Sequence, residues 1–573
     1  MPGLSSNALR VLEARYLLRD EAGRHLEDWG GLCRRVAGGV AAAETAFGGD
    51  PEPVAERFAR LLQERVFLPN SPTLMNAGTP LGQLAACFVL PIPDDLTGIF
   101  EAVKRMAVIH QSGGGTGFDF SRLRPAGDPV ARSHGVASGP VSFIEVFDAT
   151  TSVIKQGGRR RGANMGVLRM DHPDVRAFVA AKSEPGRLTN FNLSLAVGDA
   201  FFRAVEAGGS FDLVHPRDGK VVESLRAADL LDEVAAHAWA GGDPGLIFAD
   251  AVNRENPTPA LGPLEATNPC GELPLLANEA CNLGSIRIDA FVRDGRLDED
   301  GLDACVDDAV RFLDDVIEAS RYPFPEIEAT VRGNRKIGLG VMGFADLLVD
   351  LGIPYDDDRA VGLADRVMGR VRQRAEAASA RLAEERGVFP NWEGSSVARR
   401  GLRLRNATVT SIAPTGTLSI LADCSSGIEP YFGLAFVRHV LDGAELPETN
   451  RRFEEALRGS GVWSEDLLAE VRARGSARDV SGVPEAVQRL FPVASDLPGE
   501  RHLAIQEAFQ RRVDNAVSKT VNLPAGATPQ DVRDIYLSAW RRGLKGVTVF
   551  REGATAGAAL TLGATGCIDD SCP

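Results

Sequence analysis

The sequence lacks paired cysteines, zinc-site histidines and long apolar runs. Its 573 residues include eight cysteines, yet none forms a Cys-x-x-Cys pair or has a histidine at zinc-site spacing, so we predict no metal site. No apolar run reaches the roughly 18 residues that a membrane span requires, and Met1–Ser6 has no signal-peptide pattern. These absences predict a cytoplasmic protein with no membrane partner. Its scattered thiols are then inert core residues or catalytic groups.

Positively charged residues are fewer than negatively charged ones. Lys and Arg number 63 against 78 Asp and Glu, and the formal net charge of -15 argues against a nucleic-acid polymer as partner. The cluster Arg159, Arg160 and Arg161 indicates a local anion site, although a solvated charge run explains the composition about as well. The glycine-rich stretch Ser112–Gly117 lacks the Gly-Lys-Ser/Thr ending of a P-loop, so it is weak evidence for phosphate binding.

Hydrophobic periodicity separates the chain into regions. Residues 1–65 have apolar residues at helical spacing, and residues 66–550 alternate short apolar strands with helices, which is typical of an α/β sheet or barrel. Residues 551–573 are rich in Gly, Ala and Thr and contain Cys567 and Cys572. This composition predicts a flexible tail. About 15 such residues have a root-mean-square reach of roughly 20 Å, which would let the two thiols approach an active site in the same subunit or a neighbouring one.

The segment Thr267–Gly284 places a thiol between an amide and a carboxylate. Asn268, Cys270 and Glu272 are two residues apart, with Pro269 and Gly271 between them, and Pro and Gly disfavour a helix. In an extended or tightly looped backbone the three polar side chains face one side. A buried structural cysteine beside a turn fits the motif alone equally well, because free cysteines are often buried.

A second candidate site follows the predicted strand Thr408–Ile412. The turn Ala413–Leu421 opens a predicted helix, which would place the hydroxyls and backbone amides of Thr415, Gly416 and Thr417 at a helix N-terminus. Such a position suits phosphate, although an ordinary helix cap is the alternative.

Taken together, several stretches resemble the catalytic subunit of ribonucleotide reductase, most closely the class II, adenosylcobalamin-dependent type. The stretches that carry the resemblance are Phe67–Pro80, Asn268–Gly284, Asn334–Ala345, Pro414–Ser419 and Cys424–Pro430. The resemblance implies a ten-stranded α/β barrel whose central finger loop carries a cysteine that becomes a thiyl radical. It implies boundaries of 1–65 for the helical region, 66–550 for the barrel, about 88–170 for an effector-binding segment within it, and 551–573 for a redox tail.

The resemblance also implies roles for individual residues. Cys270 is the radical position, Cys87 and Cys281 are the redox pair that becomes a disulfide, and Asn268 and Glu272 position and deprotonate the sugar hydroxyls. Cys567 and Cys572 form the shuttle that a thioredoxin-like protein recharges. Substrate binding is expected at Ser71, Thr73, Ala86, Pro414, Thr415, Gly416, Thr417, Leu418 and Ser419.

Specificity control is implied at a homodimer interface. A deoxynucleotide or ATP effector is expected at Asp94, Arg124, Arg132 and Lys155, and a loop carrying Arg159, Arg160, Arg161 and Asn164 relays its identity to the substrate base. No ATP-binding cone is recognisable, so we expect specificity control without overall inhibition by dATP.

The radical source is inferred from further absences. The five tyrosines are isolated, so the tyrosine relay of enzymes with a separate radical subunit is missing, and we find no glycyl-radical motif. Adenosylcobalamin remains, and without an Asp-x-His-x-x-Gly motif we expect no histidine ligand to its cobalt. The alternatives are a class I-type catalytic subunit with a diverged relay and a non-catalytic nucleotide-binding regulator. Whether diphosphates or the less favoured triphosphates are reduced stays open.

Overall fold

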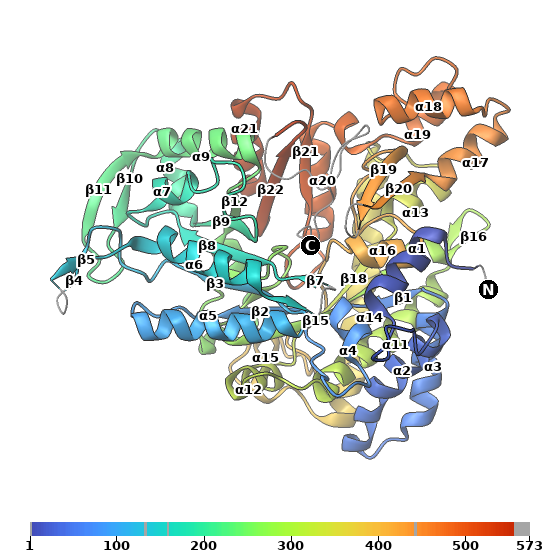
Figure 1. The fold of residues 1–573 in the computed structure, drawn as a ribbon, viewed down its shortest axis with the longest axis horizontal. Helices are drawn as coiled ribbons and strands as arrows, with labels where there is room; N and C mark the ends of the chain where they lie inside the picture. The colour runs from blue at the N-terminus through green and yellow to red at the C-terminus, as the bar shows by residue number, and fades with distance from the viewer. Residues whose placement is uncertain (1–2, 131–133, 157–159, 441–443, 555–573) are drawn as a thin grey trace.

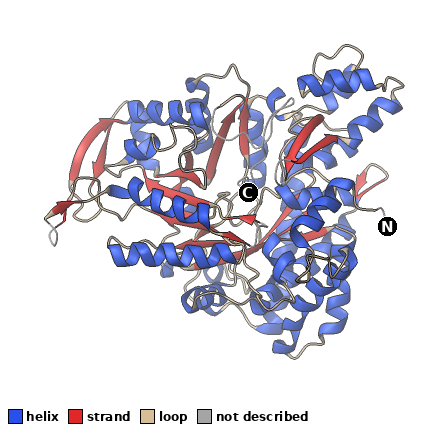
Figure 2. Cartoon of the chain, in the orientation of Figure 1, coloured by secondary structure: helices blue, strands red, loops and turns tan. Residues whose placement is uncertain are grey.

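A computed structural model describes residues 3–130, 134–156, 160–440 and 444–554. Strands run through the middle of the molecule and helices cover them from outside (Figures 1 and 2). This α/β arrangement with a helical N-terminal region confirms the predicted fold class. Across the residues described, no helix combines the length and apolar character needed to cross a bilayer.

Ten strands of the described chain join one sheet, in the order β1-β15-β2-β3-β8-β9-β12-β22-β21, with β18 also pairing β15. Their bounds are β1 (Phe67–Pro69), β2 (Cys87–Leu90), β3 (Gly115–Asp119), β8 (Asn164–Arg169), β9 (Phe191–Val197), β12 (Gly245–Phe248), β15 (Glu279–Arg287), β18 (Ile337–Met342), β21 (Thr520–Leu523) and β22 (Gly546–Arg551).

The sheet consists of two groups of strands. The strands within each group are parallel, and the two groups run antiparallel to each other where they meet. Strands β2, β3, β8, β9 and β12 are parallel to one another, and β15 pairs antiparallel with β2 while β22 pairs antiparallel with β12. Strands β15 and β18 are parallel, as are β21 and β22. Buried strands of this kind need apolar residues on both faces, which explains the short apolar runs in the sequence.

The predicted ten-stranded barrel is present as an open ring of strands. Between β18 and β21, the segment 408–412 makes only isolated parallel bridges, Leu339 to Thr410 on one side and Ile412 to Val517 on the other. The sequence predicts a strand over 408–412, and the structure places this segment between β18 and β21 in the ring. A sustained ladder does not form, so the strands do not close the barrel.

Helices surround this sheet. The principal ones are α5 (Leu96–Gln111), α6 (Gly139–Val153), α9 (Ala227–Gly241), α11 (Glu299–Ala319), α14 (Asp358–Arg386), α20 (Gly499–Gln510) and α21 (Pro529–Arg541). Shorter helices are α4 (Ser71–Asn76), α7 (Val175–Val179), α8 (Asp199–Glu206), α10 (Ala249–Arg254), α12 (Pro325–Asn334), α13 (Phe344–Asp350), α15 (Ser396–Arg399), α16 (Gly416–Ala422), α17 (Arg451–Gly459), α18 (Glu465–Arg474) and α19 (Glu485–Leu490).

The N-terminal region packs on one side of the sheet. It contains α1 (Ser6–Val11), a π-helical turn η1 (Leu12–Tyr16), α2 (Trp29–Ala41) and α3 (Pro51–Gln63). Helix α3 starts as its sequence indicates, because the Asp50 side chain accepts a hydrogen bond from the Glu52 amide and Pro51 occupies the first turn. Helix α1 lies against α16 of the barrel, so the first and later parts of the chain meet there (Figure 1).

Candidate active site

The segment around Cys270 is a narrow hairpin inside the barrel. Strands β13 (Ala266–Thr267) and β14 (Pro274–Leu275) pair antiparallel, and the Gly271 amide donates to the Asn268 carbonyl at 3.1 Å. Gly271 has a φ of 82°, a conformation that favours glycine. The prediction of a non-helical loop at this position is confirmed, and we call residues 266–275 the finger loop.

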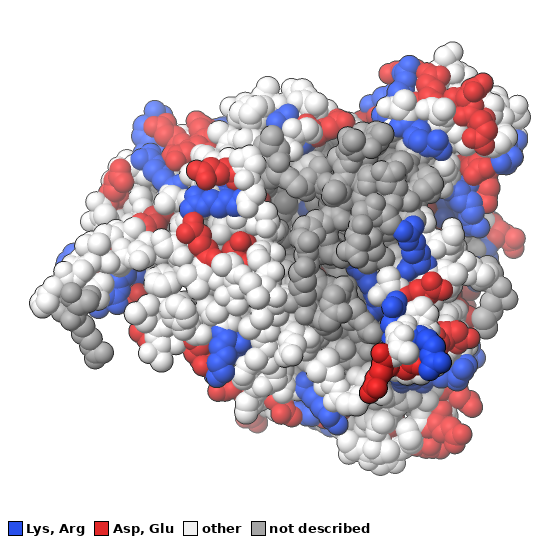
Figure 3. Space-filling model, in the orientation of Figure 1, with Lys and Arg blue, Asp and Glu red and all other residues white. Residues whose placement is uncertain are grey.

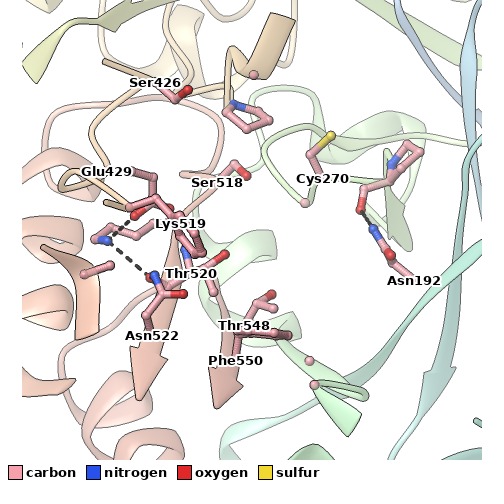
Figure 4. Close-up of a pocket in the computed structure, with 18 of the residues that line it drawn as sticks. Asn192, Cys270, Ser426, Glu429, Ser518, Lys519, Thr520, Asn522, Thr548 and Phe550 are labelled. Carbon is pink, nitrogen blue, oxygen red and sulfur yellow. Dashed lines mark hydrogen bonds and ion pairs between the residues drawn. The ribbon is translucent and has the colours of Figure 1, made fainter. Parts of the chain in front are cut away.

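The finger loop is held from opposite sides by backbone contacts. On one side a Cβ at Gly117 of β3 would lie 1.8 Å from the Thr267 carbonyl oxygen, so only glycine fits there. The Asn192 side chain donates to the Pro269 carbonyl at 2.9 Å (Figure 4). On the other side, the Ser411 hydroxyl and the Ala516 amide each donate to the Glu272 carbonyl at 2.9 Å. The barrel wall therefore fixes the position of Cys270.

Cys87 and Cys281 are directly opposite each other in the sheet. They are register partners in the antiparallel pair of β2 and β15, and both side chains are buried. Directly opposed antiparallel residues have Cα atoms about 4.5–5.5 Å apart, within the range that a disulfide spans. The Asn268 side-chain amide donates to the Cys87 sulfur at 3.2 Å, which joins the pair to the finger loop.

An ion pair lies behind Cys281. The Cys281 thiol donates to the Lys336 carbonyl at 3.4 Å, while the Lys336 ammonium contacts the Glu279 carboxylate at 2.8 Å. Both charged side chains are buried. Burial, followed by the Glu279 charge, raises the pKa of the Cys281 thiol above its ordinary value. The Cys281 thiol therefore stays protonated at neutral pH.

Glu272 is enclosed at the end of the finger loop. Its side chain is 1% exposed, and its Oε2 atom has no hydrogen-bond partner among the described residues. Burial raises the pKa of Glu272 to about 7, against the lowering effect of the Asn268 and Cys270 side chains. A carboxyl group with this pKa can exchange protons near neutral pH. The three polar side chains of the motif thus converge, as the sequence indicates.

Cys270 itself is half-buried in the wall of a cavity of about 1630 Å³. Ser426, Glu429, Ser518 and Lys519 also line it (Figure 4). Of the predicted substrate-binding residues, the cavity wall contains Pro414, Gly416, Thr417 and Ser419. The Cys270 thiol thus borders a space large enough for a nucleotide, while the Glu272 carboxyl and the opposed thiols of Cys87 and Cys281 lie buried behind it.

Residues 85–550 match the family described as ribonucleotide reductase, barrel domain, and residues 3–82 match ribonucleotide reductase, all-alpha domain. This chain belongs to the ribonucleotide reductase family. The resemblance drawn from the sequence motifs is confirmed.

Individual relatives agree with this assignment. The vitamin B12-dependent ribonucleoside-diphosphate reductase of Mycobacterium tuberculosis H37Rv is 54% identical over 563 residues, which cover 98% of this chain and 80% of that protein. The protein of the same name from Thermoplasma acidophilum is 45% identical, with 98% and 80% covered. The Actinobacillus ureae class Id ribonucleotide reductase alpha subunit has a TM-score of 0.77 at 22% identity, covering 96% of this chain and 98% of that chain, a likeness that concerns the fold.

The remaining predicted substrate residues of this reductase take part in internal hydrogen bonds or packing. Ser71 is hydrogen-bonded to the Tyr16 hydroxyl at 2.8 Å, the Thr73 hydroxyl donates to the Leu84 carbonyl at 3.0 Å, and Thr415 accepts from the Gly427 amide at 2.7 Å. Ala86 and Leu418 are buried. Their roles in substrate binding stay predictions.

The predicted effector residues are described in part. Arg124 forms an ion pair with Asp94 at 3.0 Å, and Arg217 approaches the same carboxylate at 3.8 Å. Asn164 is fully buried at the start of β8 and is bound to Thr116 and Thr151. Lys155 and Arg161 are backbone register partners in the short pair of β6 (Lys155–Gln156) and β7 (Arg160–Arg161). The described residues do not include Arg132, Arg159, Cys567 and Cys572.

Sequence reasoning missed several residues around the finger loop. Gly117 belongs to the glycine-rich stretch that we compared with a P-loop. In the structure, the nearby Thr267 carbonyl oxygen leaves no room for a side chain at this residue. Lys336 lies in the stretch Asn334–Ala345, which carries part of the family resemblance, but its residue type alone indicated no role. Arg15 lies more than 250 residues before Cys270 in the sequence, yet both line the same cavity. Only the folded arrangement reveals these pairings.

Proposed function

We propose that this chain reduces ribonucleoside diphosphates to 2′-deoxyribonucleoside diphosphates through a thiyl radical at Cys270, with adenosylcobalamin as the radical source. The main observation in support is the arrangement of the finger loop, which places Cys270 at the cavity. Asn268 of the same loop is hydrogen-bonded to Cys87, and Cys87 is the register partner of Cys281. The names of the Mycobacterium and Thermoplasma relatives support diphosphate substrates and vitamin B12 dependence.

Each side chain has a separate role in the chemistry. The Cys270 sulfur radical abstracts the hydrogen at C3′ of the ribose, and the Glu272 carboxylate accepts the proton of the 3′-hydroxyl. The 2′-hydroxyl leaves as water after protonation. Cys87 and Cys281 supply two electrons and two protons and become a disulfide. Glu272 returns its proton to the 3′-oxygen, and Cys270 finally returns its hydrogen to C3′ and is again a radical. The net reaction yields one deoxynucleotide, one water and one disulfide.

The residues in the cavity wall fit the cofactor. Gly241, Gly242 and Gly245 leave part of the wall without side-chain bulk, and Ser518, Thr520, Asn522 and Thr548 supply hydroxyl and amide groups (Figure 4). A corrin ring is broad and carries amide substituents that such groups can bind. When bound, adenosylcobalamin supplies a homolytic bond cleavage that can oxidise the Cys270 thiol. His237 also lines the cavity, where its Nδ1 atom lies 3.1 Å from the Ser183 hydroxyl. The absence of a histidine ligand to cobalt stays a prediction.

Regulation and assembly are parts of the same proposal. The Asp94 and Arg124 pair offers polar groups to an effector nucleotide, with specificity control exerted through the loop around residues 157–165. On α5, the large apolar residues Leu96 and Phe100 are 65% and 51% exposed. An exposed apolar helix face favours a homodimer. A thioredoxin-like reductant acting through Cys567 and Cys572, and a cytoplasmic location, complete the proposal.

A turnover assay separates the proposal from its alternatives. We expect the purified chain to convert ribonucleoside diphosphates to deoxynucleotides with adenosylcobalamin and a dithiol alone. Activity that ignores adenosylcobalamin and requires an added metal-containing subunit would identify a class I-type enzyme. Binding of nucleotides without any turnover under both conditions would identify a regulator.

The raised pKa of Glu272 predicts the pH dependence of this reaction. The base must be ionised, so kcat/KM should fall as the pH decreases through about 7, the pKa that burial gives this carboxyl group. We expect this inflection in the wild type, measured with saturating adenosylcobalamin. Glu272→Gln should have severely reduced activity and no such inflection. A wild-type profile that is flat between about pH 5.5 and 8 would exclude Glu272 as the base.

A further inference from the structure

The N-terminal helical region contributes a charged side chain to the cavity that contains Cys270. Helix α1 packs against α16, and the π-helical turn η1 follows directly, with the Leu17 amide bonded to the Leu12 carbonyl five residues earlier. The wider turn places Arg15 in the cavity wall together with Cys270. Short π-helical segments are rare and often mark functional sites.

Two consecutive residues of η1 contact two separate segments with predicted substrate-binding roles. The Arg15 guanidinium donates from Nη1 to the Thr417 hydroxyl at 3.1 Å. The Tyr16 hydroxyl is hydrogen-bonded to Ser71 at 2.8 Å. Tyr16 is 1% exposed and anchors the turn, whereas Arg15 is half-buried and borders the open space. Tyr16 therefore positions the turn, and the preceding residue, Arg15, faces the cavity.

The charge balance of this part of the wall favours an anion. Besides Arg15 it contains Arg65 and Asp423, which are paired with each other at 2.5 Å. The Asp423 carboxylate is thus already matched by Arg65. Across the described cavity wall, Lys and Arg outnumber Asp and Glu, although the whole chain has a net charge of -15. The wall around Arg15 is therefore less acidic than the chain as a whole, which suits an anionic ligand.

We propose that Arg15 binds the phosphate group of the nucleotide substrate, and that the N-terminal region is part of the substrate site. A guanidinium matches phosphate oxygens with paired donors, and Thr417, Ser419 and Ser426 place hydroxyl groups on the same cavity wall. This inference rests on the proposed function, since it takes a ribonucleoside diphosphate as the ligand. It adds a substrate residue that lies outside the barrel.

Binding measurements on the full chain test this role. We compare wild type, Arg15→Gln and Arg15→Lys with the matched control Arg10→Gln, which removes the same charge from an exposed position on α1. The probes are CDP and cytidine, with an excess of a deoxynucleoside triphosphate to occupy the proposed effector site. Arg15→Gln should weaken CDP binding about 10- to 100-fold, the usual scale for a lost hydrogen bond between charged groups.

Comparison of the probes separates phosphate binding from a structural effect. Cytidine, which has no phosphate, should bind Arg15→Gln as it binds wild type, Arg15→Lys should recover part of the CDP affinity, and Arg10→Gln should behave as wild type. Unchanged CDP affinity in Arg15→Gln, or an equal loss for CDP and cytidine, would overturn the inference. If wild type binds CDP but forms no deoxycytidine diphosphate, the proposed reduction fails while the role of Arg15 in binding is still measured.

Discussion

Replacement of Cys270 by serine is expected to abolish deoxynucleotide formation and to leave nucleotide binding unchanged. Serine has nearly the same shape, and Cys270 lies half-buried at the cavity wall, so the finger loop should keep its fold. An O–H bond is much stronger than an S–H bond, so the hydroxyl cannot form the radical that abstracts hydrogen from the ribose. Turnover with adenosylcobalamin and a dithiol, together with CDP binding, measures both expectations.

Cys305 provides the control for this substitution. It is a buried thiol in α11 and is not part of the described cavity wall. Cys305→Ala should keep turnover close to that of wild type. Comparable turnover in wild type and Cys270→Ser would contradict the mechanism, whereas loss of turnover in both variants would point to a general sensitivity to thiol replacement.

Replacement of Gly117 by alanine is expected to reduce turnover by about 100-fold or more, because displacement of a reacting group by about 1 Å can cost this much. The new Cβ would lie 1.8 Å from the Thr267 carbonyl oxygen. That atom belongs to the backbone of the finger loop, so relief of the clash requires movement of β3 or of the loop that carries Asn268 and Cys270. Steady-state turnover and CDP binding are the measurements.

Gly38 is a matched control for Gly117. It lies within α2, and a Cβ at this position would meet no atom within 4 Å. Gly38→Ala should therefore retain activity and raise stability by roughly 0.5–1 kcal/mol, the usual difference between Gly and Ala in a helix. Full activity in Gly117→Ala would show that the finger loop tolerates displacement, and unfolding of that variant would be detected by circular dichroism.

Local sequence chemistry predicts part of this site well. Pro269 and Gly271 exclude a helix around Cys270, and the finger loop is indeed a hairpin. The apolar run Leu84–Pro91 predicts a buried strand, and β2 lies within it. These features depend on neighbouring residues, whose backbone preferences can be read directly.

Features that depend on distant segments could not be read from the sequence. The register that places Cys87 opposite Cys281 is set by the pairing of β2 with β15, almost 200 residues apart. The raised pKa of Glu272 follows from complete burial in the fold. The approach of Arg15 to Thr417 requires α1 to pack on α16. Without coordinates, the residue types at these positions do not indicate their neighbours.

The segment 407–412 shows a different limitation. Its Thr, Val and Ile residues favour a strand, yet two isolated bridges and a few further backbone hydrogen bonds join it to its neighbours in the ring without forming a regular ladder. The side chain of Asp514 accepts hydrogen bonds from the amides of Val409 and Thr410, at 2.9 and 3.2 Å. Side-chain competition for backbone donors interrupts the regular ladder here, and strand propensity does not reveal such competition.

A single-turnover experiment tests the central claim most directly. The protein with Cys567 and Cys572 both replaced by Ser is reduced, freed of external dithiol, and mixed with adenosylcobalamin and CDP. Peptide mapping after alkylation then identifies the oxidised thiols. We predict one disulfide between Cys87 and Cys281 for each deoxynucleotide formed, and no product with Cys270→Ser in the same background. Deoxynucleotide formation with Cys87 and Cys281 both still open to alkylation would contradict the account.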